Sequence, residues 1–108
     1  MDKRELRRTV KQMVRRIVEK FHPDQVILFG SHARGTAGPD SDVDLLVVMP
    51  VAGSRRAKQL EVRMTLHEFN VPKDIIVTTP EDFEWRRKIP GTIERPASRE
   101  GQVVYARI

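Results

Sequence analysis

With 108 residues, the chain is long enough for one small domain with a single modest core, so residues 1–108 are expected to form one unit. It has no cysteine, which excludes disulfides and thiolate metal sites. No apolar run is long enough to span a membrane, and the charged start is unlike a signal peptide, so a cytoplasmic location is the default expectation. The 20 lysines and arginines outnumber the 15 acids, but they are scattered without interleaved aromatics, which favours a positively charged surface over a nucleic-acid-binding face.

The first quarter of the chain predicts a helix followed by a strand. Apolar residues recur at helical spacing over roughly residues 3–20, which indicates an amphipathic helix with a basic outer face. Pro23 is expected to end this helix and to start a turn. Residues 25–29 then read as a short apolar strand, which Gly30-Ser31 interrupts.

A short connection leads from this strand to a second one. Residues 31–36 are compatible with a short helix, and residues 37–41 read as a turn. Residues 42–49 predict the second strand. Its unbroken apolar run over residues 45–48 indicates burial on both faces of a sheet.

The second half predicts further helices and strands in alternation. Strands are expected over residues 73–79 and 102–106, and shorter helices over 82–88 and 92–99. Two consecutive strands joined by a short loop argue against a purely parallel sheet. A second amphipathic helix is predicted over residues 54–69, with these candidate apolar positions: Ala57, Leu60, Val62, Met64, Leu66 and Phe69.

Two acids interrupt the apolar second strand. Asp42 and Asp44 are two residues apart, so both side chains should project from one face, with Cα atoms ~7 Å apart. Their repulsion needs compensation, which a cation, Arg34 or solvent could each provide. The carboxylates could converge on one ion or on two ions ~4 Å apart, and oxygen ligands favour Mg²⁺ or Mn²⁺.

A third acid, Asp74, opens the predicted strand over residues 73–79. Taken alone, it is most simply a residue that begins a strand after a turn. If that strand lies beside the second one, however, Asp74 would face the same site as Asp42 and Asp44. The combination favours a site of three carboxylates.

The Gly30-Ser31 turn is a candidate anion-binding site. Glycine lets backbone N–H groups approach an anion, and the Ser31 hydroxyl can donate a hydrogen bond to a phosphate oxygen. A helix cap is the commoner explanation of such a pair, and no Walker lysine follows it. His32 is most simply an exposed helix residue.

Together, these residues resemble a known family. Gly30-Ser-His-Ala-Arg-Gly35, followed by Ser41-Asp-Val-Asp-Leu45 and then by Asp74, resembles the signature of the nucleotidyltransferase superfamily that includes DNA polymerase β. The Gly-Ser-x-Ala-Arg-Gly form resembles the minimal nucleotidyltransferases (MNT) of bacteria and archaea, as does the closing segment 99–105. The resemblance implies an α/β (α+β) fold: a mixed four-stranded β-sheet flanked by helices, which are expected on one side of it.

The resemblance also implies an activity and a role for each residue. It implies a Mg-dependent enzyme that transfers a nucleoside monophosphate, in the first place AMP from ATP, to an acceptor hydroxyl. Gly30 and Ser31 would hold the triphosphate, and Arg34 would orient the acids or touch phosphate. Two Mg²⁺ ions, or Mn²⁺ in their place, would be held by three catalytic acids: Asp42, Asp44 and Asp74.

The acceptor is expected to lie outside this chain, because the added helical domain of larger family members is missing. MNT proteins are often encoded beside a HEPN protein, and the resemblance implies an antitoxin that transfers AMP to a tyrosine of a HEPN-type toxin. An antitoxin that neutralises its partner by binding alone is the alternative. Modification of a small molecule, as in aminoglycoside nucleotidyltransferases, is less favoured. The acceptor, the preferred nucleotide and the homo- or hetero-oligomeric state stay open.

Overall fold

Four strands form one mixed sheet, in the order β3-β2-β1-β4. The structure is a computed structural model that describes residues 2–38 and 40–108. β1 (Gln25–Phe29) pairs antiparallel with β2 (Val43–Val48) and with β4 (Gln102–Ala106). β2 pairs parallel with β3 (Lys73–Thr78), so the mixed four-stranded sheet expected from the sequence is confirmed.

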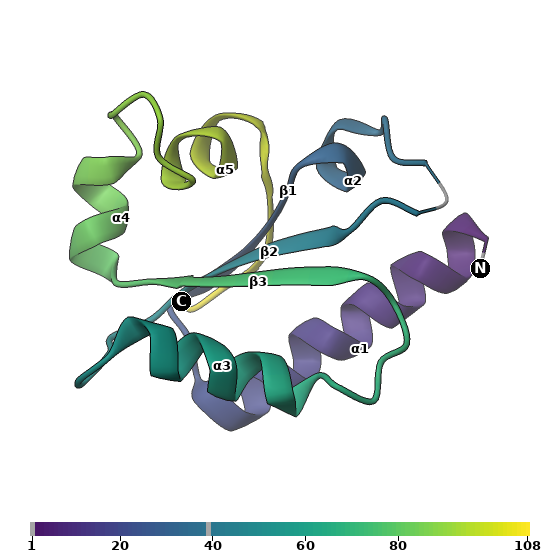
Figure 1. The fold of residues 1–108 in the computed structure, drawn as a ribbon, viewed down its shortest axis with the longest axis horizontal. Helices are drawn as coiled ribbons and strands as arrows, with labels where there is room; N and C mark the ends of the chain where they lie inside the picture. The colour runs from purple at the N-terminus through teal and green to yellow at the C-terminus, as the bar shows by residue number, and fades with distance from the viewer. Residues whose placement is uncertain (1, 39) are drawn as a thin grey trace.

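Two long helices cover one face of the sheet (Figure 1). α1 (Lys3–Phe21) is capped by His22, whose backbone is left-handed with φ 49° and which directly precedes the proline expected to end the helix. α3 (Arg55–Thr65) is capped at its start by Ser54, whose hydroxyl accepts a hydrogen bond from the backbone N–H of Ala57. No helix in the described part of the chain is long and apolar enough to cross a membrane. The main core lies between these helices and the sheet, and its central side chains are Met13, Ile17, Val26, Leu45, Val47, Val62, Leu66, Ile75 and Val77.

Three shorter helices lie on the opposite face: α2 (Ser31–Arg34), α4 (Pro80–Arg86) and α5 (Glu94–Glu100). The expectation that the helices occupy one side of the sheet is therefore wrong. The reason is the apolar run in β2, whose alternate side chains pack into cores on both faces, as that run predicted. The second core consists of Ile27, Phe29, Leu46, Val48, Phe83 and Ala97.

The α3 helix is shorter than expected, and its apolar positions differ from those predicted. It ends at Thr65, because residues 66–69 continue as turns in which the Leu66 N–H donates to the Arg63 carbonyl. Val62 and Leu66 point into the core, whereas Leu60 and Met64 are 59 % and 60 % exposed. Residues 60 and 64 lie on the opposite side of the helix from 62 and 66, so one packed face cannot bury both pairs.

Candidate active site

Asp44 and Asp74 lie side by side on neighbouring strands. The parallel register of β2 and β3 pairs their Cα atoms directly, so both side chains project from the face that carries α2, α4 and α5. Asp42 is exposed and immediately precedes β2. The structure thus brings Asp44 and Asp74 together on one face, with Asp42 two residues before Asp44.

Gly30 brings the end of β1 against the Asp44 carboxylate. Its backbone has φ 75° and ψ −155°, a conformation that is essentially restricted to glycine. A Cβ atom built on Gly30 would lie 2.2 Å from Oδ2 of Asp44. Glycine is therefore required here both for the turn into α2 and for the close approach of the acid.

The electrostatic environment of Asp44 disfavours its charged form. Burial raises the pKa of the Asp44 carboxyl above its ordinary value of 3.8, and repulsion from Asp74 and then from Asp42 raises it further. The positive charges of His32 and Arg34 oppose this rise in the pKa without cancelling it. The Asp44 carboxylate thus lacks full compensation from the protein.

The other predicted site residues lie around α2. Ser31 is the first residue of the helix and is partly buried, and its hydroxyl makes no hydrogen bond within the described residues. Arg34 is directed towards α5, where its Nη1 atom lies 3.5 Å from Oε2 of Glu100. Ser31 therefore keeps a donor for a ligand, while Arg34 has an ionic partner other than the acids.

His32 is a site residue that the sequence reasoning missed. It is partly buried rather than exposed, and its Nε2 atom lies 3.1 Å from the backbone carbonyl oxygen of Ser41. This contact joins α2 to the loop that carries Asp42. The only signal in the sequence is its place next to Ser31 in a short helix that precedes the acids.

The donor set fits a hard divalent cation in its chemistry. The three acids offer only oxygen ligands, and the raised pKa of Asp44 shows a carboxylate whose repulsion a cation would relieve. In residues 2–38 and 40–108, however, no three His, Asp or Glu side chains stand close enough together to hold an ion. Binding of an ion therefore has to draw the carboxylates together.

Residues 6–98 match the family model of the nucleotidyltransferase domain. The chain belongs to this family. A protein of Methanocaldococcus jannaschii named "putative protein adenylyltransferase" is 31 % identical to this nucleotidyltransferase domain over 100 residues, which cover 91 % of this chain and 96 % of the relative.

Two further proteins of the same organism and the same description match over shorter segments. One is 41 % identical over 64 residues, or 57 % of this chain, and the other is 34 % identical over 55 residues, or 51 %. These matches cover 44 % and 54 % of the two relatives, so the chain spans about half the length of each. They support the family and leave the activity of the whole relatives open.

Solved structures share the fold of this nucleotidyltransferase domain. A "putative nucleotidyltransferase" from Sulfolobus solfataricus superposes with a TM-score of 0.60 at 22 % identity, covering 93 % of this chain and 79 % of the other. A mutant of the toxin-antitoxin MntA-HpeT gives a TM-score of 0.61, and a toxin-antitoxin with AMP-PNP gives 0.57. Both are 14 % identical, and each match covers 90 % of this chain and 73 % of the other. At these identities the likeness establishes the fold alone.

The replacement Asp44→Asn is expected to stabilise this nucleotidyltransferase domain at neutral pH in EDTA. The replacement removes a negative charge that burial and repulsion from two acids disfavour. Charge interactions of exposed or half-exposed groups change the free energy of unfolding by about 0.5–1 kcal/mol. For a domain of this size the melting temperature should rise by about 2–6 °C. Thermal unfolding followed by circular dichroism measures the change.

The pH dependence of this gain has a definite sign. The pKa of Asp44 is higher in the folded chain than its ordinary value of 3.8. The ionised carboxyl therefore lowers the stability of the native protein, and this destabilisation is fully present above the folded pKa. This destabilisation, and with it the advantage of Asp44→Asn, should disappear as the pH falls to 3.8 and below, where the carboxyl becomes protonated in both the folded and the unfolded chain. Asp40→Asn, which removes an exposed acid of the same loop, serves as the control. A variant Asp44→Asn that melts below the native protein in EDTA at neutral pH would contradict the assignment.

Proposed function

We propose that this domain transfers a nucleoside monophosphate, in the first place AMP from ATP, to a hydroxyl group of a partner protein. The observation that carries the proposal is the direct pairing of Asp44 with Asp74 beside the Gly30 turn. Two neighbouring carboxylates at a glycine turn, of which Asp44 lacks full compensation, suit a metal–triphosphate complex better than a purely structural role. The relative named "putative protein adenylyltransferase", which matches along nearly its whole length, supports the choice of donor and acceptor.

Each residue has a distinct part in the proposed reaction. Gly30 and Ser31 hold the triphosphate through the backbone at the start of α2 and through the Ser31 hydroxyl. Arg34, at the end of this short helix, contacts phosphate or orients the acids. Asp42, Asp44 and Asp74 would hold two Mg²⁺ ions, or Mn²⁺, which when bound neutralise the triphosphate and lower the pKa of the acceptor hydroxyl.

The transfer itself is an in-line displacement at the α-phosphorus. The acceptor oxygen forms a bond to this phosphorus, while the bond from phosphorus to the bridging oxygen of the pyrophosphate breaks. The hydroxyl proton passes to the Asp74 carboxylate, and pyrophosphate leaves with the electron pair of the broken bond. Positioning and charge neutralisation supply most of the rate enhancement in such reactions.

A HEPN-type toxin is the partner that we propose as the acceptor, with this chain as the antitoxin. Two of the fold neighbours are toxin-antitoxin structures, and one of these is described with AMP-PNP, an ATP analogue. The alternative is an antitoxin that acts by binding alone. The separation of the three acids, which do not stand together as a metal-holding group in the described residues, favours that alternative.

One experiment separates the two functions. The protein is co-expressed with a candidate HEPN-type partner, and this partner is then analysed by intact-mass spectrometry. Adenylylation predicts a mass increase of one AMP group on the partner, which EDTA in a reconstituted reaction with ATP should prevent. A partner that is neutralised at unchanged mass would support binding alone and contradict the proposed transfer.

A further inference from the structure

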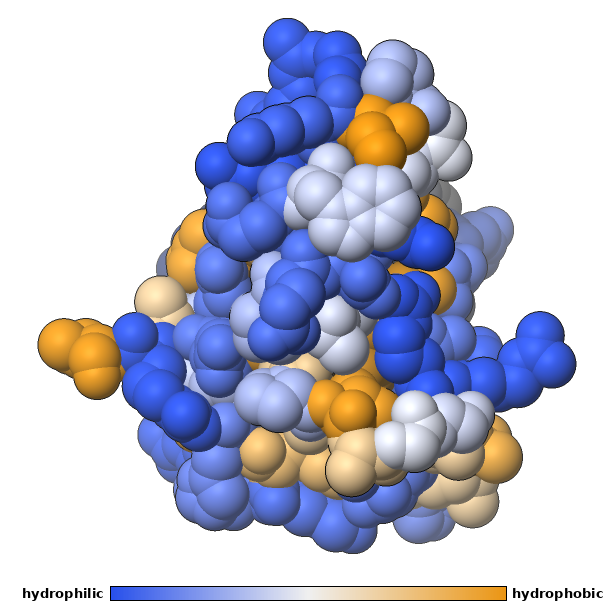
Figure 2. Space-filling model, turned by 90° about the vertical axis from the view of Figure 1, so that its left-hand side faces the viewer, coloured by the Kyte–Doolittle hydropathy of each residue, from blue (hydrophilic) through white to orange (hydrophobic). Residues whose placement is uncertain are grey.

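A pocket of about 360 Å³ lies on the same face of the sheet as the acids, between β3, α4 and α5. Figure 2 looks onto the side of the molecule that carries α4, where apolar side chains interrupt a largely hydrophilic surface. Three of the apolar residues that line the pocket are well exposed: Trp85 at 53 %, Ile93 at 41 % and Ile89 at 38 %. Ile76 of β3 lines it as well.

One of the residues that line the pocket, Arg86, has a buried donor without a partner among the described residues. The Nε atom of Arg86 is shielded from solvent and has no hydrogen-bond partner within the described residues. A buried N–H group without an acceptor costs free energy comparable to a lost hydrogen bond. Because the Arg86 guanidinium also lies 5.5 Å from the Trp85 ring centroid, the pocket combines a positive charge with an apolar wall.

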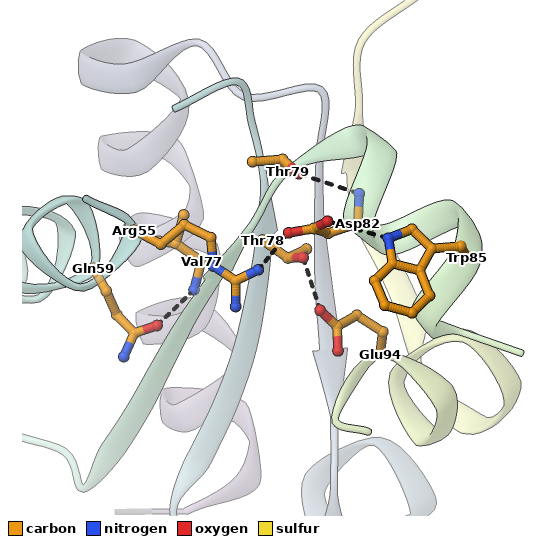
Figure 3. A network of polar contacts seen from close by, with 8 residues as sticks. All are labelled: Arg55, Gln59, Val77, Thr78, Thr79, Asp82, Trp85 and Glu94. Atoms are coloured by element: carbon orange, nitrogen blue, oxygen red, sulfur yellow. Dashed lines mark hydrogen bonds and ion pairs between the residues drawn. The ribbon is translucent and has the colours of Figure 1, made fainter. Parts of the chain in front are cut away.

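Polar contacts hold the pocket walls in place (Figure 3). Arg55 Nη1 lies 2.7 Å from Asp82 Oδ2, and the Trp85 indole N–H donates to Oδ1 of the same carboxylate over 3.2 Å. Glu94 is only 2 % exposed, and its Oε2 atom accepts a hydrogen bond from the Thr78 hydroxyl over 2.8 Å. These contacts tie α3 to α4 and β3 to the start of α5 around the pocket.

The pocket lies next to the acids, on the side away from α2. Ile76 follows Asp74 by two residues on β3 and shares its face, so their Cα atoms lie ~7 Å apart. The α2 helix, with Gly30 and Ser31, packs on β1 and β2 instead. In the sheet order β3-β2-β1-β4, the acids of β2 and β3 therefore lie between the start of α2 and the pocket.

The geometry of an in-line displacement then places the pocket on the side from which the acceptor attacks. The attacking and leaving oxygens lie on opposite sides of the phosphorus, so pyrophosphate held at α2 requires an acceptor that approaches from β3. We infer that the pocket binds the segment of the acceptor protein that adjoins its target hydroxyl. The segment places an apolar side chain against Trp85, Ile89 and Ile93, and an acidic side chain opposite Arg86. This inference rests on the proposed function, because it takes the transfer to a protein hydroxyl as given.

A defined acidic polymer tests this inference without the natural partner. A random copolymer of Glu, Ala and Tyr offers carboxylates, small apolar groups and hydroxyls, and transfer is followed with α-labelled ATP and Mg²⁺. The native protein should label it at least about ten-fold faster than a copolymer of Lys and Tyr, which presents the same hydroxyl with the opposite charge. The variants Trp85→Ala and Ile89→Glu should each reduce labelling about ten-fold, mainly through a higher KM for the polymer.

Controls distinguish the failure of this inference from the failure of the proposed function. Leu60→Ala, which truncates an equally exposed apolar residue on the opposite face of the sheet, should leave labelling within about two-fold of the native protein. AMP-PNP binding with Mg²⁺, measured by calorimetry, should be unchanged in all of these variants. Ile89→Glu alters only an exposed loop residue, so it keeps the test valid if Trp85→Ala fails to fold.

The possible contrary results contradict either the role of the pocket or the proposed function. Equal labelling by the native protein and both pocket variants would show that the acceptor does not use the pocket. Weaker AMP-PNP binding by Trp85→Ala would assign the pocket to the nucleotide base instead. Failure of the native protein to label the acidic copolymer while it binds AMP-PNP would overturn the inference alone. Failure to bind AMP-PNP with Mg²⁺ would overturn the proposed function as well.

Discussion

The replacements Asp42→Asn and Asp44→Asn should each reduce AMP transfer by about three orders of magnitude or more, because in the proposed mechanism each removes a charged ligand of the metal–triphosphate complex. Asn keeps the size of the side chain and offers a single neutral oxygen, so the loss reports charge and coordination rather than packing. The replacement Asp44→Asn distinguishes better between a loss of activity and a loss of folding. In EDTA this variant is expected to be more stable than the native protein, so stability and activity should change in opposite directions.

The measurement is the rate of transfer from α-labelled ATP to the co-expressed partner, with unfolding curves for each variant. Asp40→Asn removes one negative charge from the same loop and should retain at least about half of the native rate. Mg²⁺ should raise the melting temperature of the native protein and should have little effect on Asp44→Asn, because only the native site binds the ion tightly. Undiminished transfer by both aspartate variants would remove these carboxylates from the mechanism.

Much of the fold and the grouping of the acids follow from local sequence patterns. The strands at residues 25–29 and 102–106 have the predicted bounds, and α1 differs from its predicted range by one residue at its end. The apolar run of β2 predicted a strand buried on both faces, which is correct. The acids of β2 and β3 come together because a parallel strand that follows through one helix commonly pairs with its predecessor, as the register of Asp44 and Asp74 confirms.

Features that depend on contacts between distant segments were not predictable in this way. Leu60 and Met64 look like core residues by type, but only the packing of α3 on the sheet decides which of its faces is buried. The contact of His32 with Ser41 depends on how the loop before β2 folds back on α2. The pocket beside Arg86 likewise requires α4 and α5, which are brought together only by the sheet. The predicted metal and phosphate roles of the site residues stay predictions.

Gly30→Ala is the second replacement with a large expected effect. A Cβ atom would lie 2.2 Å from the Asp44 carboxylate, so the acid or the turn has to move by a large part of an ångström. Misplacement of a reacting group by ~1 Å can reduce the rate about 100-fold, and transfer should fall at least that far. The variant should also lose about 2–3 kcal/mol of stability, because φ 75° with ψ −155° is strained for alanine.

Gly35→Ala provides a matched control at the other end of α2. Gly35 has φ 76°, but a Cβ atom there would meet nothing within 4 Å. Its ψ of 17° places it in the left-handed helical region, so alanine should cost only about 1 kcal/mol and leave transfer nearly unchanged. Similar losses of activity in both variants would indicate that the shape of α2, rather than the approach of Gly30 to the acid, is what matters.

A double-mutant cycle isolates the contact itself from the backbone strain. In an Asp44→Ala background the carboxylate that a new Cβ would meet is gone, so Gly30→Ala should destabilise the chain less there than in the native background. The difference between the two free energies of unfolding measures the contact, since the strain at Gly30 is common to both. A coupling energy near zero would mean that the turn does not depend on Asp44. A clear coupling would establish that the Gly30 turn and the Asp44 carboxylate depend on each other, which the Gly-Ser and Asp-x-Asp motifs imply only by their spacing.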